Sequence, residues 1–175
     1  MRPTIDIAGE DEGVTLVVRT DYSDETAWRS VVALLDSPPF DGAEPVNRYV
    51  DDPAWAGATV DEVLTAAPPL YGVVFVADAA TMLPPHPLVA VNTRRPEDPD
   101  DYAYEMEYGR EFRALPAGVY DVSANLFVDN MTFPEFASSA RRDPTGHYRG
   151  LVASDRGRAA LEELMGGFGS TGHTG

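Results

Sequence analysis

The strand that decides the fold reads Tyr71-Gly72-Val73-Val74-Phe75-Val76-Ala77. Its apolar residues follow one another without alternation, which is typical of a strand covered on both faces. A second run of this kind, Val14-Thr15-Leu16-Val17-Val18-Arg19-Thr20, lies nearer the start of the chain. Two doubly covered strands predict a largely parallel sheet that lies between layers of helices.

The chain between these strands has helical periodicity. Apolar residues spaced i, i+3, i+4 and i+7 predict an amphipathic helix over 24–36, and they are Trp28, Val31, Val32 and Leu35. A short strand is predicted at 46–50, and Thr59 and Glu62 have the spacing of a capping box for a second helix. The resulting strand–helix–strand–helix–strand order over 14–77 requires right-handed crossovers between parallel strands.

Shorter connections in the second half predict an antiparallel portion of the sheet. Strands are expected at 88–91 and 148–152, and extended chain at 112–115 and 119–128. Residues 102–108 alternate between tyrosine or methionine and glutamate, which is typical of a half-exposed antiparallel strand. Thr132 and Glu135 form another capping box, and a last helix is expected from about residue 155. Its apolar stripe is Leu161, Leu164 and Met165.

The whole pattern predicts one α/β domain over 14–165, with a mixed, mostly parallel sheet, helices packed on it and an antiparallel portion in the C-terminal half. Residues 1–13 are expected to be a loose lead-in and residues 166–175 a flexible Gly-rich tail. The length of 175 residues suits a single domain. No apolar run is long enough to span a membrane, and the first residues lack the apolar core of a signal peptide. Since the chain has no Cys, we expect a cytoplasmic protein.

The charge of the chain limits its partners. All 13 basic residues are Arg, against 29 Asp and Glu, and the net charge is −16. Such a chain repels phosphate backbones and anionic membranes, so neither nucleic acid nor a membrane is an expected partner. The charge favours a basic protein or a metal cation, or serves solubility alone. The absence of Lys and Cys also excludes Schiff-base and thiolate chemistry. We expect a monomer or a small homo-oligomer.

Acidic residues follow each of the first three predicted strands. They are Asp21, Asp51, Asp52 and Asp78. Ligands of open α/β sheets bind at the carboxyl ends of the strands, and converging carboxylates there would need a cation such as Mg²⁺ or Ca²⁺. This alternative predicts a ligand-binding or metal-assisted enzyme in which Asn130 or Arg149 positions the substrate. Because Asp is also the usual capping residue between strand and helix, the favoured interpretation is that these residues are caps.

A second candidate is a surface for protein contact. Trp55 lies in a predicted loop, and the stretch 102–108 combines tyrosines with acids. Aromatic side chains of this kind are enriched at interfaces. The expected partner-binding residues are Trp55, Tyr102, Tyr104, Glu105, Glu107 and Tyr108. Together with the lack of a standard catalytic set, they favour a non-catalytic interaction or accessory module without a cofactor. A weaker alternative is a nucleic-acid mimic that uses the acids of 97–111.

The chain also resembles a family of uncharacterised actinobacterial proteins that is defined only as a domain of unknown function. The resemblance spans roughly residues 14–151 and implies a cytosolic actinobacterial protein, without implying an activity. The stretches that carry it are Val-Val-Arg-Thr-Asp-Tyr-Ser-Asp-Glu-Thr-Ala-Trp at 17–28, Tyr-Val-Asp-Asp-Pro-Ala-Trp-Ala-Gly at 49–57, Val-Phe-Val-Ala-Asp-Ala-Ala-Thr-Met at 74–82, residues 125–137, and Gly-His-Tyr-Arg-Gly at 146–150.

Overall fold

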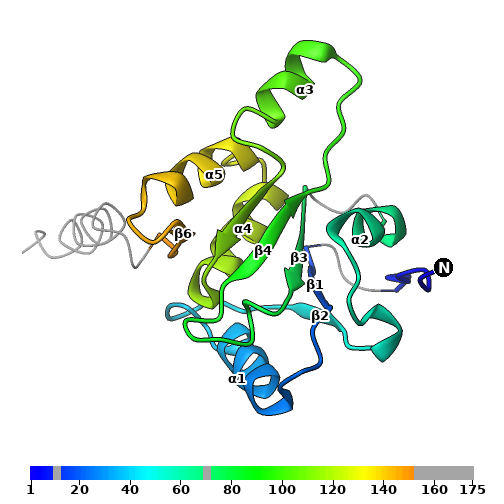
Figure 1. The fold of residues 1–175 in the computed structure, drawn as a ribbon. Helices are drawn as coiled ribbons and strands as arrows, with labels where there is room; N and C mark the ends of the chain where they lie inside the picture. The colour runs from blue at the N-terminus through cyan, green and yellow to red at the C-terminus, as the bar shows by residue number, and fades with distance from the viewer. Residues whose placement is uncertain (10–12, 69–71, 152–175) are drawn as a thin grey trace, which may run out of the picture.

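The computed structural model describes residues 1–9, 13–68 and 72–151, which build one mixed sheet with helices on both faces (Figure 1). The six strands lie in the order β2-β1-β3-β4-β5-β6. The parallel half consists of β1 (Thr15–Arg19), β2 (Asn47–Val50) and β3 (Val73–Ala77). This arrangement confirms the predicted fold class.

The antiparallel portion begins at β4 (Leu88–Asn92), which runs antiparallel to both β3 and β5 (Glu111–Ala114). The last strand, β6 (His147–Tyr148), pairs in parallel with β5. It has only two residues, fewer than the predicted 148–152. The predicted helix from about 155 and the tail at 166–175 lie outside the described residues.

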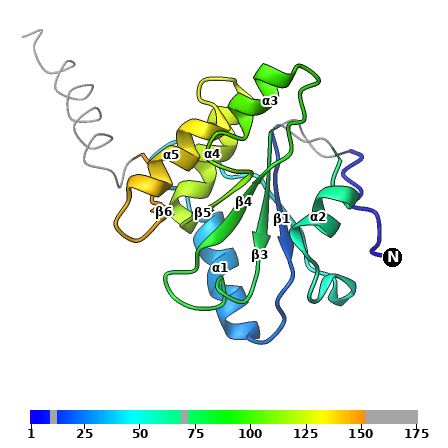
Figure 2. The same ribbon diagram turned by 45° about the horizontal axis from the view of Figure 1, so that its top comes forward.

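Two layers of helices explain the uninterrupted apolar strands. One face of the sheet carries α1 (Glu25–Asp36), α4 (Pro116–Phe127) and α5 (Phe133–Arg142), and the other carries α2 (Val60–Ala66) and the 3-10 helix η1 (Pro53–Trp55) (Figure 2). Val17 and Phe75 pack toward the first layer, whereas their neighbours Val18 and Val76 pack toward the second. Successive residues of one strand therefore pack into opposite halves of the core.

The prediction of a strand over 102–108 was wrong, because α3 (Pro99–Glu105) lies there instead. Asp98 accepts hydrogen bonds from the backbone N–H groups of Asp100 and Asp101, and Pro99 occupies the first helical turn. These start signals favour a helix. The apparent alternation at period two extends across the end of this helix into the turn that follows, so it does not belong to a single element.

The prediction of extended chain over 119–128 was also wrong, because this stretch lies in α4. Pro116 starts the helix, and the β-branched residues Val119 and Val122 face the core of the first layer. Gly118 permits close packing here, since a Cβ atom at this position would lie 2.8 Å from Cδ1 of Tyr148. Tertiary packing thus outweighs the strand propensity of these residues.

Part of the predicted lead-in is packed rather than loose. Ile5 is buried in the core layer that contains α2, and the guanidinium of Arg2 pairs with Glu62. The described part of the chain contains no helix with the length and apolar character needed to cross a membrane.

Candidate functional site

The carboxyl ends of β1 and β2 hold a buried arginine. Only 2% of the Arg19 side chain is exposed, and its NH1 lies 2.9 Å from a carboxylate oxygen of Glu25 and 3.2 Å from one of Asp51. The guanidinium carbon lies 4.2 Å from the ring centroid of Tyr22 and 5.1 Å from that of Trp28. Asp51 also accepts a 2.9 Å hydrogen bond from the indole N–H of Trp28. Asp51 is therefore engaged by Arg19 and Trp28 within the protein.

Burial and the charge of Asp51 raise the pKa of Tyr22 to about 12. The phenol beside Arg19 is thus neutral at physiological pH, and it does not supply an anionic nucleophile.

The other strand-end aspartates also have partners of their own. Asp78 forms a bidentate ion pair with Arg113 at 2.7 and 2.8 Å. Burial acts to raise the pKa of Asp78, but the hydrogen bonds and charge of Arg113 outweigh it and hold the pKa below its ordinary value. Asp21 accepts from the N–H of Ser23, and Asp52 caps η1 through the N–H of Ala54.

The aspartates therefore serve as caps and ion-pair partners. Among the described residues, no group of three or more acidic or histidine side chains is placed to hold a metal ion. Asn130 donates to Asn125, and Arg149 pairs with Asp143, so both of the predicted substrate-positioning residues are engaged with neighbours in the chain.

Trp55 does not lie on the surface. Its side chain is 1% exposed and packs in the core layer that contains Val63, and its backbone ends the capped turn of η1. Its predicted role as a partner contact is therefore corrected to a role in the core. Glu105, also among the predicted partner contacts, is only 7% exposed and accepts a 2.8 Å hydrogen bond from the amide of Asn92.

The remaining predicted contact residues lie on the connection between β4 and β5. We call residues 93–110 the α3 arm, and Figure 1 shows that its helix extends beyond the end of the sheet. Tyr102 and Tyr104 are 45% and 47% exposed. Five carboxylates of the arm are also exposed, and none of them forms an ion pair within the described part of the chain. They are Glu97, Asp98, Asp100, Asp101 and Glu107.

Contacts with β4 and α5 fix the arm to the domain. Glu105 bonds to Asn92 at the end of β4 and lies 3.7 Å from NH1 of Arg94. The hydroxyl of Tyr104 lies 3.0 Å from that of Thr132, at the start of α5. The exposed acids are thus displayed on an ordered support.

A groove of about 550 Å³ lies between the arm and α5, and we call it the α3–α5 groove. Aromatic and apolar side chains dominate its lining, with two glutamates, two serines and one arginine. They are Tyr104, Glu107, Tyr108, Met131, Pro134, Glu135, Ser138, Ser139, Arg142, Tyr148 and Leu151. Tyr148 is 5% exposed, and its hydroxyl has no hydrogen-bond partner among the described residues. Such an orphaned hydroxyl in a lined groove is suited to a ligand that supplies the missing partner.

Sequence reasoning found the arm side of this groove but missed the side formed by α5. Pro134, Ser138 and Arg142 are spaced i, i+4 and i+8, which places them along one line of a helix. This line runs beside the buried stripe that contains Phe136 and Ala140. The signal was therefore in the sequence, next to the capping box.

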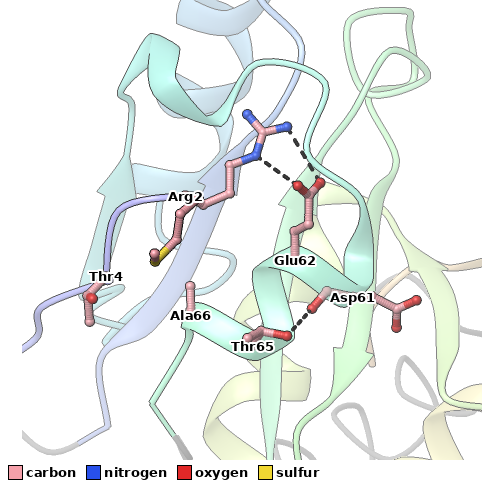
Figure 3. Close-up of a pocket in the computed structure, with 7 residues that line it drawn as sticks. Arg2, Thr4, Asp61, Glu62, Thr65 and Ala66 are labelled. Carbon is pink, nitrogen blue, oxygen red and sulfur yellow. Dashed lines mark hydrogen bonds and ion pairs between the residues drawn. The ribbon is translucent and has the colours of Figure 1, made fainter.

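Two other hollows are less suited to a ligand, because polar side chains in their lining already bond within the chain. One, of about 410 Å³, lies between the first residues and α2 (Figure 3). Arg2 at its edge already bonds to Glu62 and to the carbonyls of Ala54 and Ala56. The other, of about 470 Å³, lies beside α1 and includes Trp28 and Asp51, which are bonded to each other.

The chain belongs to a family described as "Domain of unknown function (DUF6924)", whose model matches residues 14–151. This match confirms the predicted membership in a family of unknown function. No curated protein and no solved structure matches the chain. The matched region includes all six strands, the α3 arm and every lining residue of the α3–α5 groove.

Proposed function

We propose that this protein is a non-catalytic interaction module that binds a basic protein partner through the α3 arm and the α3–α5 groove. The observation that carries the proposal is the set of five exposed carboxylates on the arm, none of which is paired within the described residues. They stand beside an aromatic groove in a chain of net charge −16.

The acids and the groove would contribute differently to binding. A solvent-exposed ion pair contributes about 0–1 kcal/mol, so the arm acids would mainly accelerate association and orient the partner. Most of the affinity must then come from apolar burial. Tyr104, Tyr108 and Met131 provide such a surface in the groove, and tyrosine is among the residues enriched in binding hot spots.

The arm is ordered before the partner arrives. Asp98 caps α3, Glu105 bonds to Asn92, and Tyr104 contacts Thr132. Binding to a preorganised surface loses less conformational entropy than binding to a disordered segment. This order distinguishes the α3 arm from an acidic tail that serves solubility alone.

Site-specific photocross-linking tests the proposal. The photoreactive residue p-benzoylphenylalanine replaces Tyr102 in one variant and Phe40 in the other, which are exposed to 45% and 41%. The ring of Phe40 meets that of Tyr120 edge to face, at a surface that shares no residue with the arm or the groove. Cross-linked proteins from a native lysate are identified by mass spectrometry at low and at moderate salt.

We expect the Tyr102 variant to capture a defined basic protein that the Phe40 variant does not capture, with a yield that falls as salt is raised. Equal capture at the two positions, or no specific capture at Tyr102 at either salt concentration, would contradict the proposal. A captured nucleic-acid-binding protein whose basic groove covers the arm would favour the nucleic-acid mimic instead.

A further inference from the structure

The end of the described chain lies at the groove. Leu151 is the last described residue and belongs to the groove lining. The described chain therefore ends in the groove lining, which also includes Tyr148 and Pro134. Leu161 follows Leu151 by ten residues (161 − 151), which is on the order of 35 Å of extended chain. The segment thus reaches any part of the groove.

The sequence of this segment complements the groove in charge. After Asp155 the segment has two basic residues, Arg156 and Arg158, followed by Glu162 and Glu163. The groove side of the domain also carries both signs, with Glu107 on the arm and the exposed Arg142 on α5. Each sign of charge in the segment has a counterpart at the groove.

The apolar residues of the segment need a surface on which to pack. Leu161, Leu164 and Met165 have the spacing of one helical face. A helix shorter than about 12–15 residues is marginal on its own in water, so this face gains stability only by contact with another surface. Tyr104, Tyr108 and Met131 offer an apolar surface within reach, beside the orphaned hydroxyl of Tyr148.

We propose that residues 152–168 of the same chain occupy the α3–α5 groove and compete there with the partner. This inference rests on the proposed function for the identity of the competing ligand, but the occupancy itself is a property of the isolated protein. Tethering gives the segment an effective concentration in the millimolar range, so weak contacts suffice for substantial occupancy. A partner must then displace the segment before it binds.

The absence of Cys makes disulfide trapping a specific test. One variant of the full chain carries Ser139→Cys in the groove together with Ala160→Cys. The matched control carries Thr65→Cys on α2, at the opposite face of the sheet, together with the same Ala160→Cys. Both are equilibrated in a glutathione redox buffer at low protein concentration, and the intramolecular disulfide is quantified by mass spectrometry.

We expect the Ser139 pair to form its disulfide with an effective concentration at least about tenfold above that of the Thr65 pair. Adding Leu161→Asp and Leu164→Asp should reduce the Ser139 pair to the control level. Equal effective concentrations in the two pairs, or no response to these two aspartates, would overturn the proposal. Since no partner is present, this failure is distinct from a failure of photocross-linking at Tyr102.

Discussion

Two regions of the molecule are acidic: the corner at the carboxyl ends of the parallel strands, which contains Asp51 and Asp78, and the α3 arm. The acids of the two regions differ in whether they form ion pairs. At the corner, Arg19 forms an ion pair with Asp51 and Arg113 forms one with Asp78. On the arm, by contrast, the exposed acids have no ion-pair partners among the described residues, and the only buried acid, Glu105, anchors the helix. The corner is thus organised for stability, whereas the arm leaves its charge available to another molecule.

This difference shows that the position of acidic residues in a fold is a weaker guide to a binding site than whether those residues are paired within the protein. In open α/β sheets, the ends of parallel strands are the usual place for ligands. In this protein each strand-end aspartate has an internal partner or caps a turn. The comparison can be tested by substitutions in the two regions, which should change stability to very different extents.

The largest effect on stability is expected at the centre of the corner. Arg19→Met should lower the free energy of unfolding by about 2–4 kcal/mol, because it leaves Glu25 and Asp51 without their buried counter-charge. The upper end of the range for buried pairs is not expected, since both carboxylates are partly solvated. Urea denaturation measures the change. Arg29→Met is the control, because the 75% exposed Arg29 side chain pairs with the same Glu25 at 3.8 Å and should change stability by less than about 0.5 kcal/mol.

The next effect is expected at Asp78 and should depend on pH. Asp78→Asn should cost about 1–2 kcal/mol near neutral pH, because it removes the bidentate contact with Arg113. The pKa of Asp78 is lower in the folded protein than its ordinary value of 3.8, so its contribution is present above that pH and is lost as pH falls through the folded pKa. The difference between wild type and variant, measured by urea titration, should therefore shrink below about pH 3.8. A difference that stays constant over this range would contradict the assigned ion pair.

Asp121 on α4 extends the comparison of paired and unpaired acids. It is buried, and no ion pair is found for it in the described residues. Burial raises its pKa, while the N–H of Leu151 donates to it at 2.6 Å. An acid with a raised folded pKa loses stability as pH rises from its ordinary value of 3.8 through the folded pKa.

We therefore expect Asp121→Asn, which keeps a hydrogen-bond acceptor without the charge, to equal or exceed wild type in stability near neutral pH, by up to about 1 kcal/mol. At pH values below 3.8, where the wild-type carboxyl is protonated, the two proteins should converge. Thermal melts across this pH range measure both. A variant that is less stable at every pH would show that the negative charge itself is favourable.

The smallest effect on stability is expected on the arm. Asp100→Asn combined with Asp101→Asn should change the free energy of unfolding by no more than about 0.5 kcal/mol, because both side chains are exposed and their backbone N–H groups remain capped by Asp98. Urea denaturation beside Arg19→Met gives the contrast directly. A loss as large as that of the corner variant would show that the arm acids stabilise the fold, and the distinction between the two regions would fail.

Local sequence signals predicted most of the fold. The apolar runs of β1 and β3, the stripe of α1 and the two capping boxes each depend on neighbouring residues, and each is found where expected. The failures at α3 and α4 occurred where β-branched and aromatic residues mimic a strand while the packing is helical. In both cases a proline in the first helical turn was the better signal.

The candidate site was predictable only in part. Tyr102 and Tyr104 are exposed as predicted, even though the secondary structure predicted for 102–108 was wrong, because composition alone favours a surface position for this stretch. The burial of Trp55 and Glu105 depends on residues distant in sequence, since Trp55 lies in the same core cluster as Leu16 and Glu105 bonds to Asn92. The ion pair of Asp78 with Arg113 also joins residues distant in sequence, so no local sequence pattern predicts it.

The most direct test of the central claim compares two charge reversals in the Tyr102 photocross-linking experiment. Asp100→Arg with Asp101→Arg reverses two acids on the arm, and Asp41→Arg with Glu44→Arg makes the same change in net charge at exposed positions between α1 and β2. We predict that the arm variant loses at least about tenfold in cross-linking yield while its unfolding free energy stays within about 0.5 kcal/mol of wild type, and that the control keeps its yield. Equal losses in the two variants would mean that only the overall charge matters, and would contradict a binding site on the α3 arm.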